Sequence, residues 1–194
     1  MYRFRLLLLA LGVSVAMSGC TGAPDVGPAA AFDAYMRDIA ARDLDTVMAH
    51  FADDMEAEFS PDYVIPREEM RRVLTFDFAV NSRTEHTVIA ETDDSVEVEM
   101  VENNDLLTLL GVRDMRVRLR VDFHDGQIIR QTMLDLSFTG PSMDEAMEPF
   151  LAWAREHEPE QFSQIHGDAG PVYTGDAAPT WLTLARQWRE TVNP

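Results

Sequence analysis

The sequence has 194 residues and a formal net charge of −18, with 34 acidic and 16 basic residues. So acidic a chain repels nucleic acid and anionic lipid head groups, which excludes nucleic-acid binding and electrostatic binding to an anionic membrane. The length suits one domain with a sizeable core.

Residues 1–19 have the composition of a secretory signal peptide. Arg3 and Arg5 give a basic start, an apolar run of about a dozen residues follows, and small residues end it. The apolar run is too short to span a bilayer. The only cysteine, Cys20, comes directly afterwards. Met17-Ser18-Gly19-Cys20 resembles the lipobox of bacterial lipoproteins, in which the cysteine becomes the lipidated first residue of the mature chain.

This resemblance implies a membrane anchor. Fatty acyl chains such as palmitate on Cys20 would hold the protein stably, at ~0.8 kcal/mol per buried CH₂. Residues 20–29 would form the lipidated end and a Gly- and Pro-containing tether. Thr21 is not the Asp that retains lipoproteins in the inner membrane, so the expected location is the outer membrane, facing the periplasm. An ordinary secretory signal with a chance cysteine is the alternative.

Residues 31–54 predict two consecutive amphipathic helices. Phe32, Tyr35, Met36 and Ile39 recur at the spacing of one helix face. Asp43 is a good N-cap residue, after which a second apolar stripe begins. Because the two helices share an apolar side, that side must be covered, and the following sequence predicts a sheet that can cover it.

The next segments alternate between predicted strands and short helices. Alternation of apolar and polar residues predicts strands at 55–59, 88–91, 95–102, 115–123 and 127–138. Short helices are predicted at 66–74 and 103–111, and 124–126 reads as a hairpin turn.

Arg116, Arg118 and Arg120 lie on the opposite face of strand 115–123 from its apolar residues. We expect this row to face acidic residues such as Glu97 and Glu99 across the sheet, because oppositely charged cross-strand pairs stabilise it. A binding site for an anionic substrate is the alternative.

The order of these elements, with the patterns "DLDTVMAHFADD" and "FHDGQI", resembles the nuclear transport factor 2-like superfamily, including its SnoaL-like members and ketosteroid isomerases. The resemblance covers residues 30–138. It implies an α+β fold in which a strongly bent antiparallel sheet wraps around the N-terminal helices to form a cone with an apolar pocket. It also implies a possible homodimer through the sheet. Fold alone does not give function.

The same resemblance suggests where catalytic residues would lie. Tyr35 falls where ketosteroid isomerases carry an oxyanion-hole tyrosine. The position of their general base falls at Phe59, and that of their protonated aspartic acid near Leu119, so steroid isomerisation is not expected. Tyr35 as an ordinary core residue is the simpler interpretation.

Asp135 is the other candidate, because it is in phase with Gln131 and Met133 on the last predicted strand. A lone carboxylate in an apolar cone would have a raised pKa and could act as an acid or base; the alternative is an Asp on the solvated outer face. The expected ligand pocket is lined by Tyr35, Phe59, Leu119, Met133 and Asp135, with Trp153 or Trp181 near its mouth. The five histidines show no metal-ligand spacing, and no cofactor motif occurs.

Residues 139–194 predict a C-terminal helical extension on the same folded unit. Ser142 and Glu145 form a capping box, and Trp181, Leu184 and Trp188 share one helix face. The extension is expected to close the mouth of the cone or to cover the sheet.

Three functions fit this pattern. The first is an envelope lipoprotein whose pocket binds a small apolar or amphipathic ligand without catalysis. The second is an isomerase or lyase that uses Tyr35 and Asp135. The third is a protein–protein adaptor whose pocket is filled by its own side chains.

Overall fold

The computed structural model describes residues 27–168 and 170–192. The predicted signal peptide, Cys20 and most of the predicted tether lie outside the described residues, and the lipid anchor therefore stays a prediction. Among the described helices, none combines the length and the hydropathy that a membrane crossing requires.

Seven helices and eight strands occur in the described chain. The helices are α1 (Pro28–Ala41), α2 (Leu44–Ala49), α3 (Arg67–Ala79), α4 (Asp105–Leu110), α5 (Met143–His157), α6 (Pro159–Ile165) and α7 (Ala178–Val192). The strands are β1 (Phe51–Ser60), β2 (Tyr63–Pro66), β3 (Arg83–Glu91), β4 (Ser95–Asn103), β5 (Asp114–His124), β6 (Gln127–Thr139), β7 (His166–Gly167) and β8 (Gly170–Pro171).

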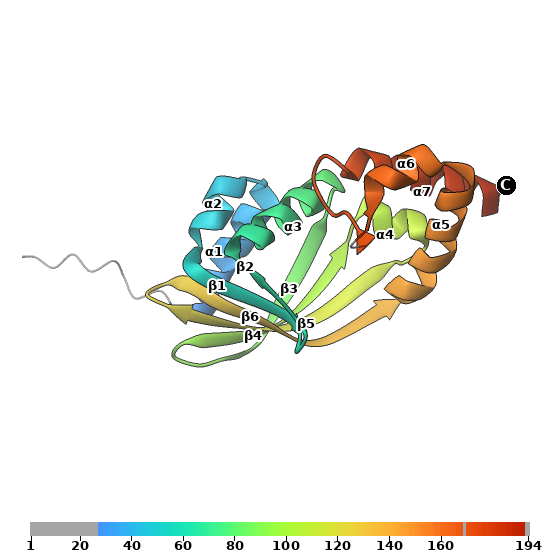
Figure 1. Cartoon of the computed structure of the whole chain (residues 1–194). Helices are drawn as coiled ribbons and strands as arrows, with labels where there is room; N and C mark the ends of the chain where they lie inside the picture. Colours follow the sequence, from blue (N-terminus) through green and yellow to red (C-terminus); the bar gives the residue numbers. More distant parts are fainter. Residues whose placement is uncertain (1–26, 169, 193–194) are drawn as a thin grey trace, which may run out of the picture.

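Six strands form one bent sheet in the order β2-β1-β6-β5-β4-β3. Helices α1, α2 and α3 lie against one face, and the C-terminal helices gather at the other end of the sheet (Figure 1). The predicted α+β cone with a C-terminal helical extension is thus confirmed. The prediction of a wholly antiparallel sheet needs one correction, because β1 and β6 pair in parallel.

Helix α1 and the whole of α2 lie where the apolar spacing predicted two helices. Arg42 turns the chain with a φ of 59°, and the Asp43 carboxylate caps α2 by accepting from the Thr46 amide at 3.2 Å. The predicted second helix is too long, since α2 ends at Ala49 and Phe51 already belongs to β1. Pairing of Phe51 with β6 overrides the local helical pattern there.

The outer face of the sheet carries the arginine row. Arg118 contacts Glu97 at 2.8 Å and Arg116 contacts Glu99 at 3.6 Å, which confirms the predicted cross-strand pairing. Because these pairs are exposed, each contributes only about 0–1 kcal/mol to stability.

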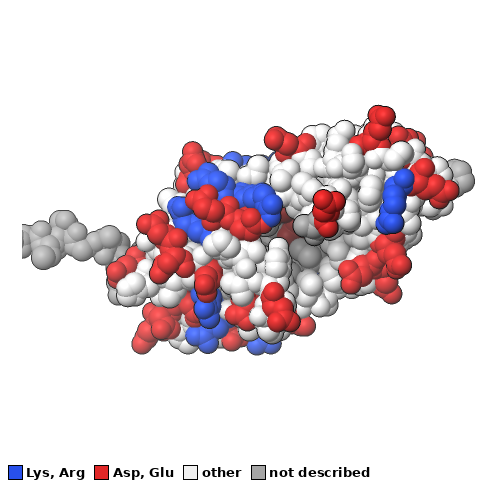
Figure 2. All heavy atoms as spheres, viewed as in Figure 1, with Lys and Arg blue, Asp and Glu red and all other residues white. Residues whose placement is uncertain are grey.

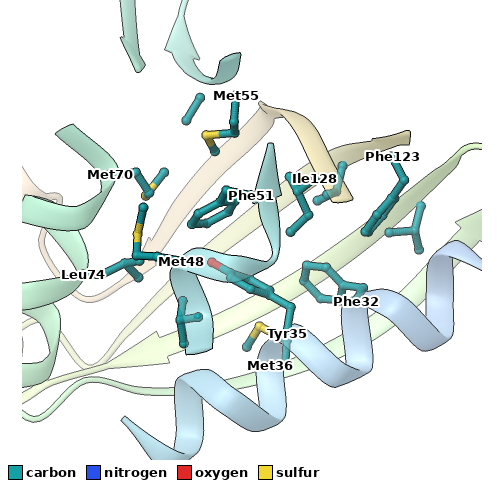
Figure 3. Close-up of a cluster of buried hydrophobic side chains, with 14 of the residues drawn as sticks. Phe32, Tyr35, Met36, Met48, Phe51, Met55, Met70, Leu74, Phe123 and Ile128 are labelled. Atoms are coloured by element: carbon teal, nitrogen blue, oxygen red, sulfur yellow. The ribbon is translucent and has the colours of Figure 1, made fainter. Parts of the chain in front are cut away.

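The buried apolar side chains form two clusters. The cone cluster joins α1, α2 and α3 to the concave face of the sheet, and Figure 3 shows much of it, with Phe32, Tyr35 and Met36 extending from α1. The C-terminal cluster joins α4, α5, α6 and α7 to the end of α3. The molecule therefore has one core within the cone and another at its end.

Trp181 is the centre of the C-terminal cluster and is fully buried. Its ring lies 5.9 Å from that of Phe150 and 6.5 Å from that of Phe76 on α3. Its Nε1 donates to the Val172 carbonyl oxygen at 2.9 Å. The contact with Phe76 fixes the extension to the cone. The predicted capping box of Ser142 and Glu145 is present at the start of α5.

Candidate functional site

A cavity of about 270 Å³ lies inside the cone, between α1, α3 and the concave face of the sheet. Its wall is mostly apolar, with side chains from both helices and from β1, β3, β4, β5 and β6. This volume is just below the usual range of ligand pockets, which is about 300–1,000 Å³, and suits only a small molecule.

Four of the five predicted pocket residues line this cavity. They are Tyr35 from α1, Phe59 from β1, Leu119 from β5 and Met133 from β6. The predicted tryptophans are not among the lining residues. Trp181 is buried in the C-terminal cluster and Trp153 packs against that cluster.

The fifth residue, Asp135, does not lie in the cavity, and the prediction that it does was wrong. Arg118 pairs with Asp135 while the next residue, Leu119, pairs with Met133, so Leu134 is an extra residue in β6. This bulge moves Asp135 to the opposite face from Met133. Asp135 is exposed beside Arg118, and it cannot act together with Tyr35.

Three other acidic residues line the cavity, Glu58, Asp77 and Glu102, and the carboxyl groups of the last two are buried. Asp77 lies on α3, one turn beyond Val73 and Leu74, which also line the cavity. Glu102 is opposite Met115 in the β4–β5 ladder, on the same face of the sheet as Val98. The fold therefore brings one carboxyl from a helix and one from a strand to the same wall.

Glu102 is held in place by its neighbours. The Ser82 hydroxyl donates to its Oε1 at 2.8 Å, and Asn104 Nδ2 donates to the same oxygen at 3.2 Å. Asn104 is itself fixed as the N-cap of α4, where its Oδ1 accepts from the Leu107 amide at 2.8 Å. The end of β4 and the start of α4 thus position the Glu102 carboxyl.

Burial raises the pKa of both acids. The pKa of Asp77 is well above its ordinary value, first because of desolvation and then because of the negative charge of Glu102. Desolvation also raises the pKa of Glu102, while the hydrogen bonds from Ser82 and Asn104 act in the opposite direction. No hydrogen bond to the Asp77 carboxyl occurs within the described chain, so Asp77 is the better site for a proton that the pair shares.

Tyr35 adds a third polar group to the same cavity. Its ring packs against Phe32 and Phe51, with centroids 5.7 and 5.5 Å away. Burial raises the pKa of its hydroxyl to about 12; Asp77 adds to this effect, and the Gln131 side chain opposes it. Tyr35 is therefore a neutral hydroxyl near neutral pH.

The site can hold a small molecule that has an apolar body and one polar group. A protonated Asp77 and the Tyr35 hydroxyl can donate hydrogen bonds, and an ionised Glu102 can accept them. The described residues contain no group of three or more His, Cys, Asp or Glu side chains arranged to hold a metal ion.

A larger hollow, of about 1110 Å³, lies at the other end of α1. It is lined by Glu91, Asp93, Asp94 and Asp125 among others. It contains none of the predicted pocket residues and borders Gly27, where the described residues begin. The cavity in the cone, which is largely apolar and is lined by four of the predicted pocket residues, is the better candidate site.

The sequence was compared with family models and curated proteins, and neither comparison gave a match. Solved structures do match. A protein from Xanthomonas campestris, provisionally described as a polyketide cyclase, is 19% identical, with a TM-score of 0.43 over 53% of this chain and 85% of its own. A protein from Kribbella flavida, provisionally described as a ketosteroid isomerase, is 18% identical, with a TM-score of 0.42 over 60% of this chain and 83% of its own.

A third structure, an NTF2-like protein of unknown function from Cytophaga hutchinsonii, is 9% identical, with a TM-score of 0.41 over 57% of this chain and 88% of its own. These proteins are similar to the present chain over little more than half its length. With TM-scores below 0.5, the likeness carries no inference about activity or ligand.

Proposed function

We propose that this protein is a lipid-anchored envelope protein that binds a small, largely apolar ligand with one polar group inside its cone. The observation that carries the proposal is the largely apolar cavity with Asp77, Glu102 and Tyr35 in its wall. Apolar walls bind the body of a ligand through the hydrophobic effect, and a few buried polar groups fix its orientation.

The two alternative functions are less well supported. An enzyme that uses Tyr35 and Asp135 lacks its acid, because Asp135 lies on the outer face of the sheet. An adaptor with a filled pocket would leave no space in the cone, whereas about 270 Å³ is open there. Binding without turnover needs only the features that the cavity has.

Calorimetric titration with the neutral compounds indole and 2-phenylethanol tests the binding function. The first variant, Leu119→Trp, places a large side chain in the cavity wall and should weaken binding of both compounds by at least about tenfold. The matched control is Leu134→Trp, because Leu134 is an exposed leucine of the adjacent strand. Absence of binding to the unaltered protein, or equal loss in both variants, would contradict the proposal.

The anchor is tested by a separate experiment. Cys20 is the sole cysteine and directly follows the apolar leader. In a bacterium, the Cys20→Ser protein should leave the membrane fraction, and the unaltered protein should remain in it. Equal retention of the two proteins would contradict the anchor while leaving the binding function untouched.

A further inference from the structure

The charges of the cavity wall are all of one sign. Its acidic members are Glu58 from β1, Asp77 from α3 and Glu102 from β4, and its one other titratable member is Tyr35 from α1. Strands β3, β5 and β6 contribute only apolar and neutral polar side chains to the wall. Of the described residues that line the cavity, none is Arg, Lys or His. An anionic ligand would therefore be repelled by every charged group that it meets.

From this wall, and resting on the proposed function, we infer that the ligand carries its polar group as a cation: a small hydrophobic amine whose ammonium lies between Asp77 and Glu102. An ammonium is costly to remove from water unless it is paired, and here two carboxyl groups are available to pair with it. The hydrogen bonds from Ser82 and Asn104 both go to Oε1 of Glu102, and Asp77 receives none in the described chain. Acceptor positions on both acids thus stay free for N–H groups of the ligand.

The rest of the wall suits the same ligand. Tyr35, Phe32 and Phe78 are aromatic, and the faces of aromatic rings attract cations. Methionines occur on α1, α3, β4, β5 and β6, and their polarisable thioethers adapt to apolar bodies of different shape. The acidic surface works in the same direction at longer range. Acidic side chains are scattered over the face in Figure 2, with basic side chains among them, and the net charge of −18 raises the local concentration of cations.

Binding of an ammonium should release a proton from the acid pair. Burial favours the protonated form of these acids in the empty cavity, whereas a cation beside them favours the ionised form. Affinity for an amine should therefore rise with pH as the empty pair ionises. It should fall again only when the amine itself loses its proton, at about pH 10 for an alkyl ammonium.

The probes are 2-phenylethylamine and its neutral counterpart 2-phenylethanol, titrated by calorimetry at pH 5 and pH 8. At pH 8 we expect the amine to bind at least about tenfold more tightly than the alcohol, as a charge-assisted hydrogen bond would give. At an intermediate pH, titration in buffers of different ionisation enthalpy should show proton release for the amine alone. The alcohol should bind almost equally at both pH values.

The variant protein Asp77→Asn/Glu102→Gln keeps the size of both side chains and removes their charges. It should bind the amine and the alcohol within about threefold of each other. Glu99→Gln is the matched control, because Glu99 lies on the outer face of the same strand as Glu102 and pairs with Arg116. This control should keep the preference of the unaltered protein.

The outcomes separate the two proposals. If neither probe binds, the proposed function fails. If the alcohol binds but the amine binds no better at pH 8, the cation inference is overturned and the acid pair serves a neutral ligand. If the amine preference survives in the double variant, the general surface charge causes it, and the inference is again overturned.

Discussion

The two ends of this molecule are packed by different rules. In the C-terminal cluster, Trp181 is stacked on Tyr173 with ring centroids 5.3 Å apart and lies 5.9 Å from Phe150, in a core of aromatic and aliphatic side chains. The cone cluster, by contrast, surrounds a cavity of about 270 Å³ and places Asp77 and Glu102 in its wall. The C-terminal cluster is filled and apolar, whereas the cone cluster contains a cavity and two acids that have no cationic partner.

The difference distinguishes the residues of the C-terminal cluster, which stabilise the fold, from the acids of the cavity wall, which lower its stability. A cavity lowers the stability of the folded state because its walls lack packing contacts. A buried acid without a cationic partner lowers it because the carboxyl group loses its hydration. Neither feature helps the cone to fold, and both agree with the proposed binding role. The filled cluster offsets them, because its contacts with the end of α3 and with α4 hold the wall that carries both acids.

The largest expected effect is the loss of Trp181 from the filled cluster. Trp181→Ala removes a fully buried ring and its hydrogen bond to Val172, which should lower the free energy of unfolding by ~3–5 kcal/mol. Denaturant unfolding, followed by circular dichroism, measures this loss. Trp188→Ala is the matched control and should cost less, because Trp188 is half-buried at the edge of the cluster. An equal cost for both tryptophans would contradict the filled-core description.

A smaller effect of opposite sign is expected in the cone. Asp77→Asn and Glu102→Gln each remove an acid whose pKa is raised in the folded protein. Such an acid binds its proton more tightly in the folded state, so its stabilising effect is complete below its unfolded pKa and is lost as pH rises through its folded pKa. Both variants should therefore be more stable than the unaltered protein at pH 8, by a gain on the order of 1 kcal/mol, and should gain little at pH 4.

Thermal unfolding at the two pH values checks this expectation. Glu99→Gln controls for a change of net charge on the same strand and should show no such pH-dependent gain. A destabilisation of Asp77→Asn at pH 8 would mean that its carboxylate has a stabilising partner, which would contradict the unneutralised pair.

The sequence predicted most of the strands and helices, because their apolar residues keep a regular period, but it missed β2 and the first part of β3. It missed Asp77 because the helix predicted at 66–74 continues to Ala79, which makes Asp77 part of the stripe that includes Val73 and Leu74. A carboxylate in phase with an apolar stripe was the available signal. Glu102 gave a similar signal, since it follows Val98 and Met100 on the inner face of β4.

The error at Asp135 had a different cause. Strict alternation predicted that Met133 and Asp135 share a face, and it cannot anticipate a bulge. Leu134 is the extra residue, and Ile129 is another, since Asp122 pairs with Arg130 and Phe123 with Ile128. Neither bulge contains a glycine, so local sequence offered no sign of either. Only the pairing of whole strands determines this register.

The smallest expected effect follows from that corrected position. Asp135 is exposed beside Arg118, which already pairs with Glu97 at 2.8 Å. Asp135→Asn should therefore change the free energy of unfolding by no more than about 0.5 kcal/mol, and it should leave the affinity for 2-phenylethanol and 2-phenylethylamine unaltered. Calorimetric titration beside Asp77→Asn makes the comparison direct, because the two variants carry the same chemical change on opposite sides of the cone wall. A loss of amine binding in Asp135→Asn as large as that in Asp77→Asn would mean that Asp135 lies in the cavity, and would contradict the register of β6.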